Sequence, residues 1–420
     1  MMNLQEILFG LILFFIIIEF VIERILHHLN MNSWSKELPN ELKAFYNHQE
    51  YLKAMNYALD NARISNFSVW INFAFIIFIL LTKSIGYIDS LIRQVSENEI
   101  IMSLLFFGLA GIASYIISLP LSLYSTFVIE EKYGFNKTTG KIFILDSIKS
   151  ILLAAIFGGG LLSLIIYIYE QTGSFFWIIS WAVFILFTVF ISMFYSKLIV
   201  PLFNKQKPLE EGEIRNEVID FAAKVGFIIK NIFVIDGSKR STKANAYFTG
   251  FGRNKRIVLY DNLINDYKTD EVVAVLAHEI GHSKLKHTII GLFMGIFQTG
   301  ILLYILSIFI SADSSTYKAI AEVFGAKSSF YISVIGFGLL YSPISLFTSL
   351  LMNYISRRNE YAADKFAAQK YNGKALGSAL IKLSNKNLSN LTPHPLFVIF
   401  YHSHPTLLQR LKALEENDSH

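Results

Sequence analysis

The amino-acid sequence predicts an α-helical polytopic membrane protein that also carries an α+β domain outside the membrane. The first observation is composition: 53% of the 420 residues are hydrophobic and 16% are charged, whereas soluble domains carry about 25% charged residues. The second is that the apolar residues form long blocks, which are typical of membrane spans. The third is that two polar segments, 196–287 and 355–420, are long enough to fold outside the bilayer.

Seven blocks have the length and low charge expected of transmembrane helices. The first block has no basic stretch before it and no small-residue cleavage site, so we expect a retained span and not a signal peptide. The chain has no cysteine, which excludes disulfides, zinc–thiolate sites and a thiol nucleophile. The seven blocks are residues 6–24, 66–82, 100–127, 151–169, 175–195, 288–310 and 329–354.

The distribution of Lys and Arg predicts the orientation, because basic loops face the cytoplasm. It places the N-terminus outside and segments 27–65, 128–150, 196–287 and 355–420 in the cytoplasm. We expect the net charge of +5 to reflect this bias and contact with anionic lipid of the bilayer. The charge is dispersed and no recognition motif is present, so no nucleic-acid partner is expected. The expected location is the ER membrane in a eukaryote or the cytoplasmic membrane in a bacterium.

The spans divide the chain into four parts. Residues 1–195 hold the first five spans with their loops, and residues 288–354 hold the last two. Residues 196–287 and 355–420 flank the last two spans, so we expect them to assemble into one cytoplasmic domain.

The first of these cytoplasmic parts has clear secondary-structure signals. It begins with an amphipathic helix that Gly226 should end, followed by a strand at 229–236. Two more strands are expected on either side of a turn at 250–254. Asp270 is expected to cap the next helix.

That next helix contains "HEIGH", residues 278–282. In a helix, positions i and i+4 lie about 40° apart, so His278 and His282 can both point a ring nitrogen at one ion. Glu279 is rotated by about 100° and can reach the open side of the ion without being a ligand. The HExxH pattern favours a zinc site over the alternative of buried, hydrogen-bonded histidines. His287 should point about 140° away from His282 and lie at the membrane surface.

A catalytic zinc ion needs a third protein ligand, and "RRNEYAADKFAA" offers the best candidates. Glu360 and Asp364 share a helix face: one carboxylate can bind zinc, and the other can accept the N–H of a ligand histidine. The alternative is a solvated acidic face, against which the apolar neighbours argue.

Near the C-terminus, His404 precedes a proline in "YHSHPTLLQR" and so adopts an extended or turn conformation. It could donate a hydrogen bond to an oxyanion, and Arg410 could hold the acidic residues. A plain surface loop is an equally good interpretation of this stretch, and His402 is the weaker candidate.

Together these stretches resemble the integral-membrane zinc CAAX prenyl proteases of type I. The total length and the seven spans agree with that family, and the motifs occur in the family's order. The matching stretches are "IEEKYGFNKTT" at 129–139, "ANAYFTGFG" at 244–252, "KRIVLYDNLI" at 255–264, "LAHEIGHSKLKH" at 276–287, "RRNEYAADKFA" at 357–367 and "SHPTLLQRL" at 403–411.

The resemblance implies the fold and the site. It implies seven helices that enclose a chamber, with an α+β HExxH zinc protease domain at its cytoplasmic end. One Zn²⁺ per chain would be held by His278, His282 and Glu360, with Glu279 as the catalytic base. Asp364 would support a ligand histidine, and His404 and Arg410 would line the site.

The resemblance also implies that "NAYF" is the strand that holds the substrate. An exposed edge strand can pair with an extended peptide, through Asn245, Ala246 and Tyr247. One departure stands out, because Gln409 occupies a position before Arg410 that is usually acidic. It puts one supporting ion pair in doubt.

The expected activity is that of a membrane-embedded zinc metalloendopeptidase. It would remove the C-terminal tripeptide from prenylated CAAX proteins through attack of a zinc-activated water, with Glu279 as general base. The expected partners are a peptide or protein substrate carrying an isoprenoid and the lipid bilayer. One alternative is a protease of broad selectivity for membrane-protein quality control. Another is a non-catalytic channel or transporter with a structural zinc.

Overall fold

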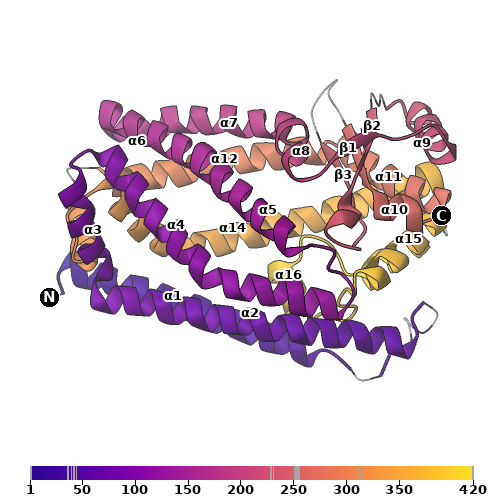
Figure 1. Cartoon of the computed structure of the whole chain (residues 1–420), viewed down its shortest axis with the longest axis horizontal. Helices are drawn as coiled ribbons and strands as arrows, with labels where there is room; N and C mark the ends of the chain where they lie inside the picture. The colour runs from indigo at the N-terminus through magenta and orange to yellow at the C-terminus, as the bar shows by residue number, and fades with distance from the viewer. Residues whose placement is uncertain are drawn as a thin grey trace.

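The computed structural model describes residues 2–418 with the exception of residues 36, 39, 41, 42, 44, 228, 230, 250–255, 312 and 313. Long helices run side by side along the longest axis, and a small sheet with shorter helices gathers at one end (Figure 1). The predicted turn at 250–254 lies outside the described residues.

The membrane part is helical throughout. Helix α4 continues into a π-helical segment η2 (Ser125–Glu130), and a second π-helical segment η3 (Ala154–Gly159) joins α5 to α6. The α-helices are α1 (Leu4–Asn32), α2 (His48–Thr82), α3 (Ser84–Val95), α4 (Glu99–Tyr124), α5 (Gly140–Leu153), α6 (Gly160–Thr172), α7 (Phe176–Leu198), α8 (Val200–Phe203), α12 (His287–Phe309), α13 (Ser315–Val323) and α14 (Phe330–Ala367).

Six continuous helical runs within the described residues are long and apolar enough to cross a membrane. The run Gly140–Phe203 contains two such helices, because the chain turns at Gly173, where φ is +54°. Each of the seven predicted spans therefore falls on a separate helical stretch, the fourth running from the end of α5 through η3 into α6, and the prediction of a multi-pass helical membrane protein is confirmed.

The sheet lies beyond the membrane helices and has the strand order β1-β2-β4-β3. Strands β2 and β4 are parallel, whereas β1 and β3 pair antiparallel with their neighbours. Strand β3 thus forms one edge of the sheet. The strands are β1 (Gln206–Pro208), β2 (Asn231–Ile235), β3 (Ala246–Thr249) and β4 (Arg256–Tyr260).

Helices from both polar segments pack with this sheet, and we call the resulting unit the sheet domain. Helix α9 ends before Gly226 in a left-handed conformation (φ +61°), as predicted. Leu276 and Ile280 of the first segment share a hydrophobic core with Leu376 and Leu414 of the second. The helices are α9 (Glu213–Lys224), α10 (Asp261–Asp266), α11 (Thr269–Lys284), α15 (Gly373–Lys386), α16 (Pro395–Tyr401) and α17 (Leu407–Asp418).

Helix α14 connects the membrane part to the sheet domain without a break. Its 38 residues span about 57 Å at about 1.5 Å per residue, which exceeds the about 30 Å hydrocarbon core of a bilayer. The excess carries Glu360 and Asp364 into the sheet domain as part of a rigid helix.

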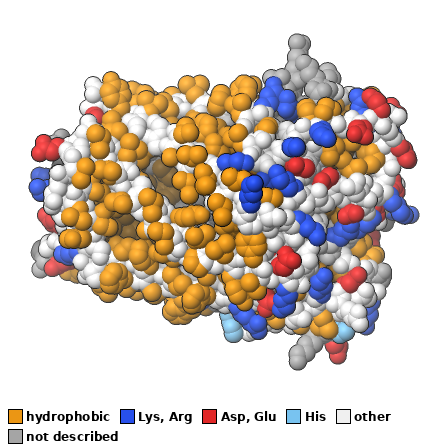
Figure 2. Space-filling view, viewed as in Figure 1, with side chains coloured by type: hydrophobic (Ala, Val, Ile, Leu, Met, Phe, Trp, Pro, Cys, Tyr) orange, Lys and Arg blue, Asp and Glu red, His pale blue; other side chains and the backbone are white. Residues whose placement is uncertain are grey.

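The four segments predicted to share one side of the membrane lie at the same end of the molecule. Ser33 donates to the carbonyl of Thr392 at 2.7 Å, and Arg240 pairs with Asp146 at 2.8 Å. Figure 2 shows charged side chains concentrated at this end and hydrophobic side chains covering the other part of the visible face. This division agrees with a membrane-embedded part and a water-exposed part.

Candidate metal centre and active site

Helix α11 carries the HExxH residues and is held in the core of the sheet domain. Its first residue follows Lys268, whose N–H donates to the Glu271 carboxylate at 3.0 Å. The prediction that Asp270 caps the helix is wrong by two positions, because Glu271 reaches back to satisfy the free N–H group. Asp270 instead accepts a hydrogen bond from the Glu271 N–H at 2.9 Å, within the first turn.

The glycine of "HEIGH" permits a close approach between α11 and α14. A Cβ atom at Gly281 would lie 3.3 Å from the Cα of Ala363 and 3.1 Å from the Phe366 ring. Both distances are tighter than ordinary van der Waals contact. Glycine at this position therefore brings the histidines of α11 next to Glu360, which lies one turn before Ala363.

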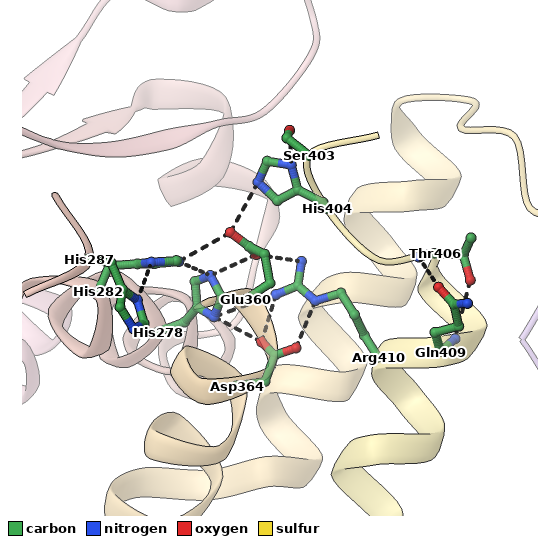
Figure 3. A network of polar contacts seen from close by, with 10 residues as sticks. All are labelled: His278, His282, His287, Glu360, Asp364, Ser403, His404, Thr406, Gln409 and Arg410. Carbon is green, nitrogen blue, oxygen red and sulfur yellow. Dashed lines mark hydrogen bonds and ion pairs between the residues drawn. The ribbon is translucent and has the colours of Figure 1, made fainter. Parts of the chain in front are cut away.

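Three ligand atoms converge at this crossing (Figure 3). Nε2 of His278 lies 3.1 Å from Nε2 of His282 and 3.4 Å from Oε2 of Glu360. Nε2 of His282 lies 3.2 Å from Oε1 of Glu360. A tetrahedral zinc ion with bonds of about 2.0–2.2 Å keeps its ligand atoms about 3.3–3.6 Å apart, and these separations, measured to a different Glu360 oxygen from each histidine, lie close to that range. We call the two Nε2 atoms and the Glu360 carboxylate the ligand triangle.

The environment of Glu360 also fits a cation. The residue is only 4% exposed, and its buried Oε2 has no hydrogen-bond partner among the described residues. Nη1 of Arg410 lies 3.7 Å from this oxygen, beyond hydrogen-bond distance. A buried carboxylate oxygen without a hydrogen bond is costly, and a metal ion would reduce that cost. The donor set of two imidazoles and one carboxylate is one that zinc accepts in catalytic sites.

Asp364 and Arg410 hold His278 from the other side. Oδ1 of Asp364, a side chain that is 1% exposed, lies 2.8 Å from Nδ1 of His278. Arg410 donates two hydrogen bonds to the same carboxylate, at 2.8 and 2.7 Å. The Asp364 oxygen fixes the His278 proton on Nδ1, which leaves the Nε2 lone pair free for a metal.

His287 provides the corresponding partner for the second histidine. Its Nδ1 lies 3.0 Å from Nδ1 of His282, so the prediction that it points away is wrong. The angle calculation assumed a continuous helix, but α11 ends at Lys284 and Lys286 adopts a left-handed conformation (φ +61°). The chain turns there, and His287 begins α12 beside the site. The presence of a third histidine close after HExxH was the feature of the sequence that could have indicated this partner.

Glu279 and His404 lie beside this triangle. Burial raises the pKa of the Glu279 carboxyl above its usual range, and within the described part of the chain its oxygens have no hydrogen-bond partner. Nε2 of His404 lies 3.3 Å from Oε1 of Glu360, although the side chain is 61% exposed. Its loop is fixed to α14, because Arg357 donates to the carbonyl of His402 at 2.7 Å. The His402 ring packs on Phe397 instead.

Comparison with known proteins places the chain in a family. Residues 27–205 match the model described as CAAX prenyl protease N-terminal, five membrane helices, and residues 208–418 match the peptidase family M48 model. The chain belongs to peptidase family M48. Membership of this family confirms the prediction that the chain is a membrane-embedded metalloendopeptidase.

Similar M48 relatives cover nearly the whole chain. CAAX prenyl protease 1 of Saccharomyces cerevisiae is 37% identical over 403 residues, covering 90% of this chain and 88% of the relative. The human CAAX prenyl protease 1 homolog is 33% identical, covering 91% and 90%. The crystal structure of S. mikatae Ste24p superimposes with a TM-score of 0.90 at 34% identity, covering 97% of this chain and 99% of that chain.

Within this M48 chain, Gln409 takes part in a helix cap and does not point at the metal centre (Figure 3). Its Oε1 accepts from the N–H of Thr406 at 3.0 Å, and its own N–H donates to Oγ1 of Thr406 at 3.3 Å. This reciprocal pair is a capping box at the start of α17, a motif that accepts Gln as well as Glu. The loss of a negative charge at this position therefore leaves the Arg410–Asp364 pair in place.

The residues predicted to hold substrate lie at the edge of the sheet. Ala246 and Tyr247 pair with Leu259 and Val258 of β4, and Asn245 is an exposed residue directly before the strand. Ala246 packs toward the core that includes α11, whereas Tyr247 lies on the opposite face, where its hydroxyl accepts from Gln206 at 3.4 Å. The Asn245 carbonyl accepts from the Tyr260 N–H at 3.0 Å, so in this register the backbone groups of Tyr247 face β4 and those of Ala246 face the free edge.

Proposed function

We propose that this M48 peptidase is a zinc metalloendopeptidase with one zinc ion per chain, bound by His278, His282 and Glu360. The supporting observation is that the two Nε2 atoms lie 3.1 Å from each other and 3.2–3.4 Å from the oxygens of the Glu360 carboxylate. A zinc ion bound there supplies a Lewis acid that polarises the scissile carbonyl and lowers the pKa of a water.

Four residues of the chain then have distinct roles in the reaction. Glu279 accepts the proton of the attacking water and delivers it to the leaving amine. His404, exposed on its anchored loop, donates a hydrogen bond to the carbonyl oxygen as negative charge develops on it. Asp364 keeps His278 in the ligating tautomer, and Arg410 keeps Asp364 in position.

The proposed substrate is a protein whose C-terminal CAAX sequence carries an isoprenoid, and the proposed product lacks the last three residues. The names of the relatives and their coverage of this chain support this substrate. The edge strand β3 pairs with the extended peptide through the outward-facing backbone of Ala246, whose N–H donates to the exposed Asn245 side chain at 2.8 Å in the free protein. The sheet domain, made of residues 196–287 and 355–420, faces the cytoplasm because the basic loops lie at its end.

A cleavage assay with two peptides tests the proposal. Purified protein should contain about one zinc per chain, cleave a farnesylated CAAX peptide efficiently and cleave the unprenylated peptide detectably but more slowly. Chelation should abolish both activities, and added zinc should restore them. Equal rates on both peptides at subsaturating concentration would favour a protease of broad selectivity. Zinc-loaded protein that cleaves neither peptide would indicate a structural zinc.

A further inference from the structure

A cavity of about 1000 Å³ lies in the membrane part, between α4, α5 and α6. Apolar side chains form most of its wall, and glycines of α4 and η3 create its space: a Cβ atom at Gly108, Gly111 or Gly158 would meet nothing within 4 Å. Figure 2 shows this face as hydrophobic and hollowed. We call this cavity the lateral pocket.

The polar lining of the lateral pocket lies toward the sheet domain. Thr126 comes from η2 at the end of α4, and Thr138, Asp146, Ser147 and Ser150 come from α5 and the residues before it; the one further polar group, the hydroxyl of Tyr115, comes from within α4. Two π-helical segments, η2 and η3, border the pocket, and such segments often mark functional sites. The pocket is therefore apolar in its depth and polar at the rim nearest the candidate active site.

This rim is tied directly to the segment that leads into β3. Arg240 donates to the Asp146 carboxylate at 2.8 and 3.0 Å, and its carbonyl accepts from Thr138 at 3.3 Å. Lys243 pairs with Glu130, the last residue of η2, at 3.0 Å. Ala246 is six positions after Arg240, so the backbone of Arg240 at the rim lies within about 20 Å of the substrate strand. The rim of the pocket is thus hydrogen-bonded to the segment that leads into the strand.

We propose that the lateral pocket binds the isoprenoid chain of the substrate, an inference that rests on the proposed function. An uncharged chain attached to a peptide on β3 reaches the rim and finds an apolar interior. A phospholipid is the poorer occupant, because the residues that line the pocket include no Lys or Arg to meet its phosphate. The pocket thus selects prenylated peptides, whereas the metal centre and the edge strand act on the backbone.

Filling the pocket tests this inference. Gly108→Leu and Gly158→Leu place a side chain in the open space, and Gly10→Leu on α1 is the matched control, because its Cβ also meets nothing within 4 Å. The readout is the ratio of kcat/KM for farnesylated and unprenylated peptide within each variant, so partial loss of folded enzyme cancels. We expect the ratio to fall at least tenfold in both pocket variants and to stay within twofold of wild type in the control.

Photo-crosslinking of wild-type enzyme with a diazirine-bearing prenylated peptide gives a second measurement. Labels on residues 104–162 support the pocket if excess prenylated peptide prevents them from forming. Labels elsewhere, labels displaced only by phospholipid vesicles, or an unchanged ratio in the pocket variants would overturn it. Wild-type enzyme that cleaves neither peptide would count against the proposed function alone, since the crosslinks still decide whether the pocket binds the chain.

Discussion

Replacing His287 by Phe should weaken zinc binding without touching a zinc ligand. The His282 ring has one nitrogen in the ligand triangle and the other 3.0 Å from His287. Phe fills the same space but offers no acceptor, so the His282 proton is no longer fixed on Nδ1. The Nε2 lone pair is then available for the metal only part of the time.

The expected loss is a 10–100-fold rise in the Kd for zinc, which is the usual effect of removing such a partner and corresponds to about 1.4–2.7 kcal/mol. Competition against a fluorescent chelator measures the Kd directly. His287→Gln should recover most of the affinity, since its side-chain carbonyl can accept the same proton. Cleavage at saturating zinc should fall less than the affinity does.

A matched control separates this effect from general damage. His48→Phe changes an exposed histidine at the start of α2 and should leave the zinc Kd unchanged. The melting temperature of the metal-free protein should be the same for His287→Phe and wild type. A zinc Kd for His287→Phe within twofold of wild type would refute the reasoning, as would a Kd for the Gln variant no better than for Phe.

Substitutions elsewhere in the chain give further predictions. Glu279→Gln should retain zinc by metal analysis but lose about 10²–10⁴-fold in kcat; a loss below tenfold would exclude it as the base. Glu360→Ala should lower zinc occupancy after dialysis, and unchanged occupancy would remove it from the ligand set. Lys243→Met breaks the 3.0 Å pair with Glu130 and should cost about 1–3 kcal/mol of stability while raising KM more than kcat falls. The exchanged pair Lys243→Glu with Glu130→Lys should restore KM if the contact positions β3. Glu19, Glu23 and His27 recur every four residues along α1, and ionisable groups within a span normally face a polar interior. Glu19→Cys would introduce the only cysteine of the chain, so labelling by a water-soluble thiol reagent is expected, and complete resistance would argue against a water-filled chamber.

Local sequence patterns were sufficient to predict the membrane spans and the residues that share one face of a helix. Membrane spans follow from hydropathy and length alone, because the bilayer imposes both on every helix that crosses it. Spacing by four residues placed His278 and His282 on one face of α11, and Glu360 and Asp364 on one face of α14. Only the structure shows that these two faces meet, through the close approach at Gly281.

The remaining features depend on contacts between distant residues. The position of His287 follows from a left-handed residue that stops α11, and no periodic pattern encodes that stop. The ties of Arg240 and Lys243 to Asp146 and Glu130 join segments about a hundred residues apart. The lateral pocket arises from glycines on two helices whose packing the sequence does not state.

The most direct test of the proposed zinc enzyme is a crystallographic anomalous difference map recorded at the zinc edge. We predict a single strong peak per chain, within about 2.0–2.2 Å of Nε2 of His278, Nε2 of His282 and a carboxylate oxygen of Glu360. A peak at any other set of residues would contradict the proposed site. So would the absence of a peak in protein that still cleaves the peptide in the presence of a chelator.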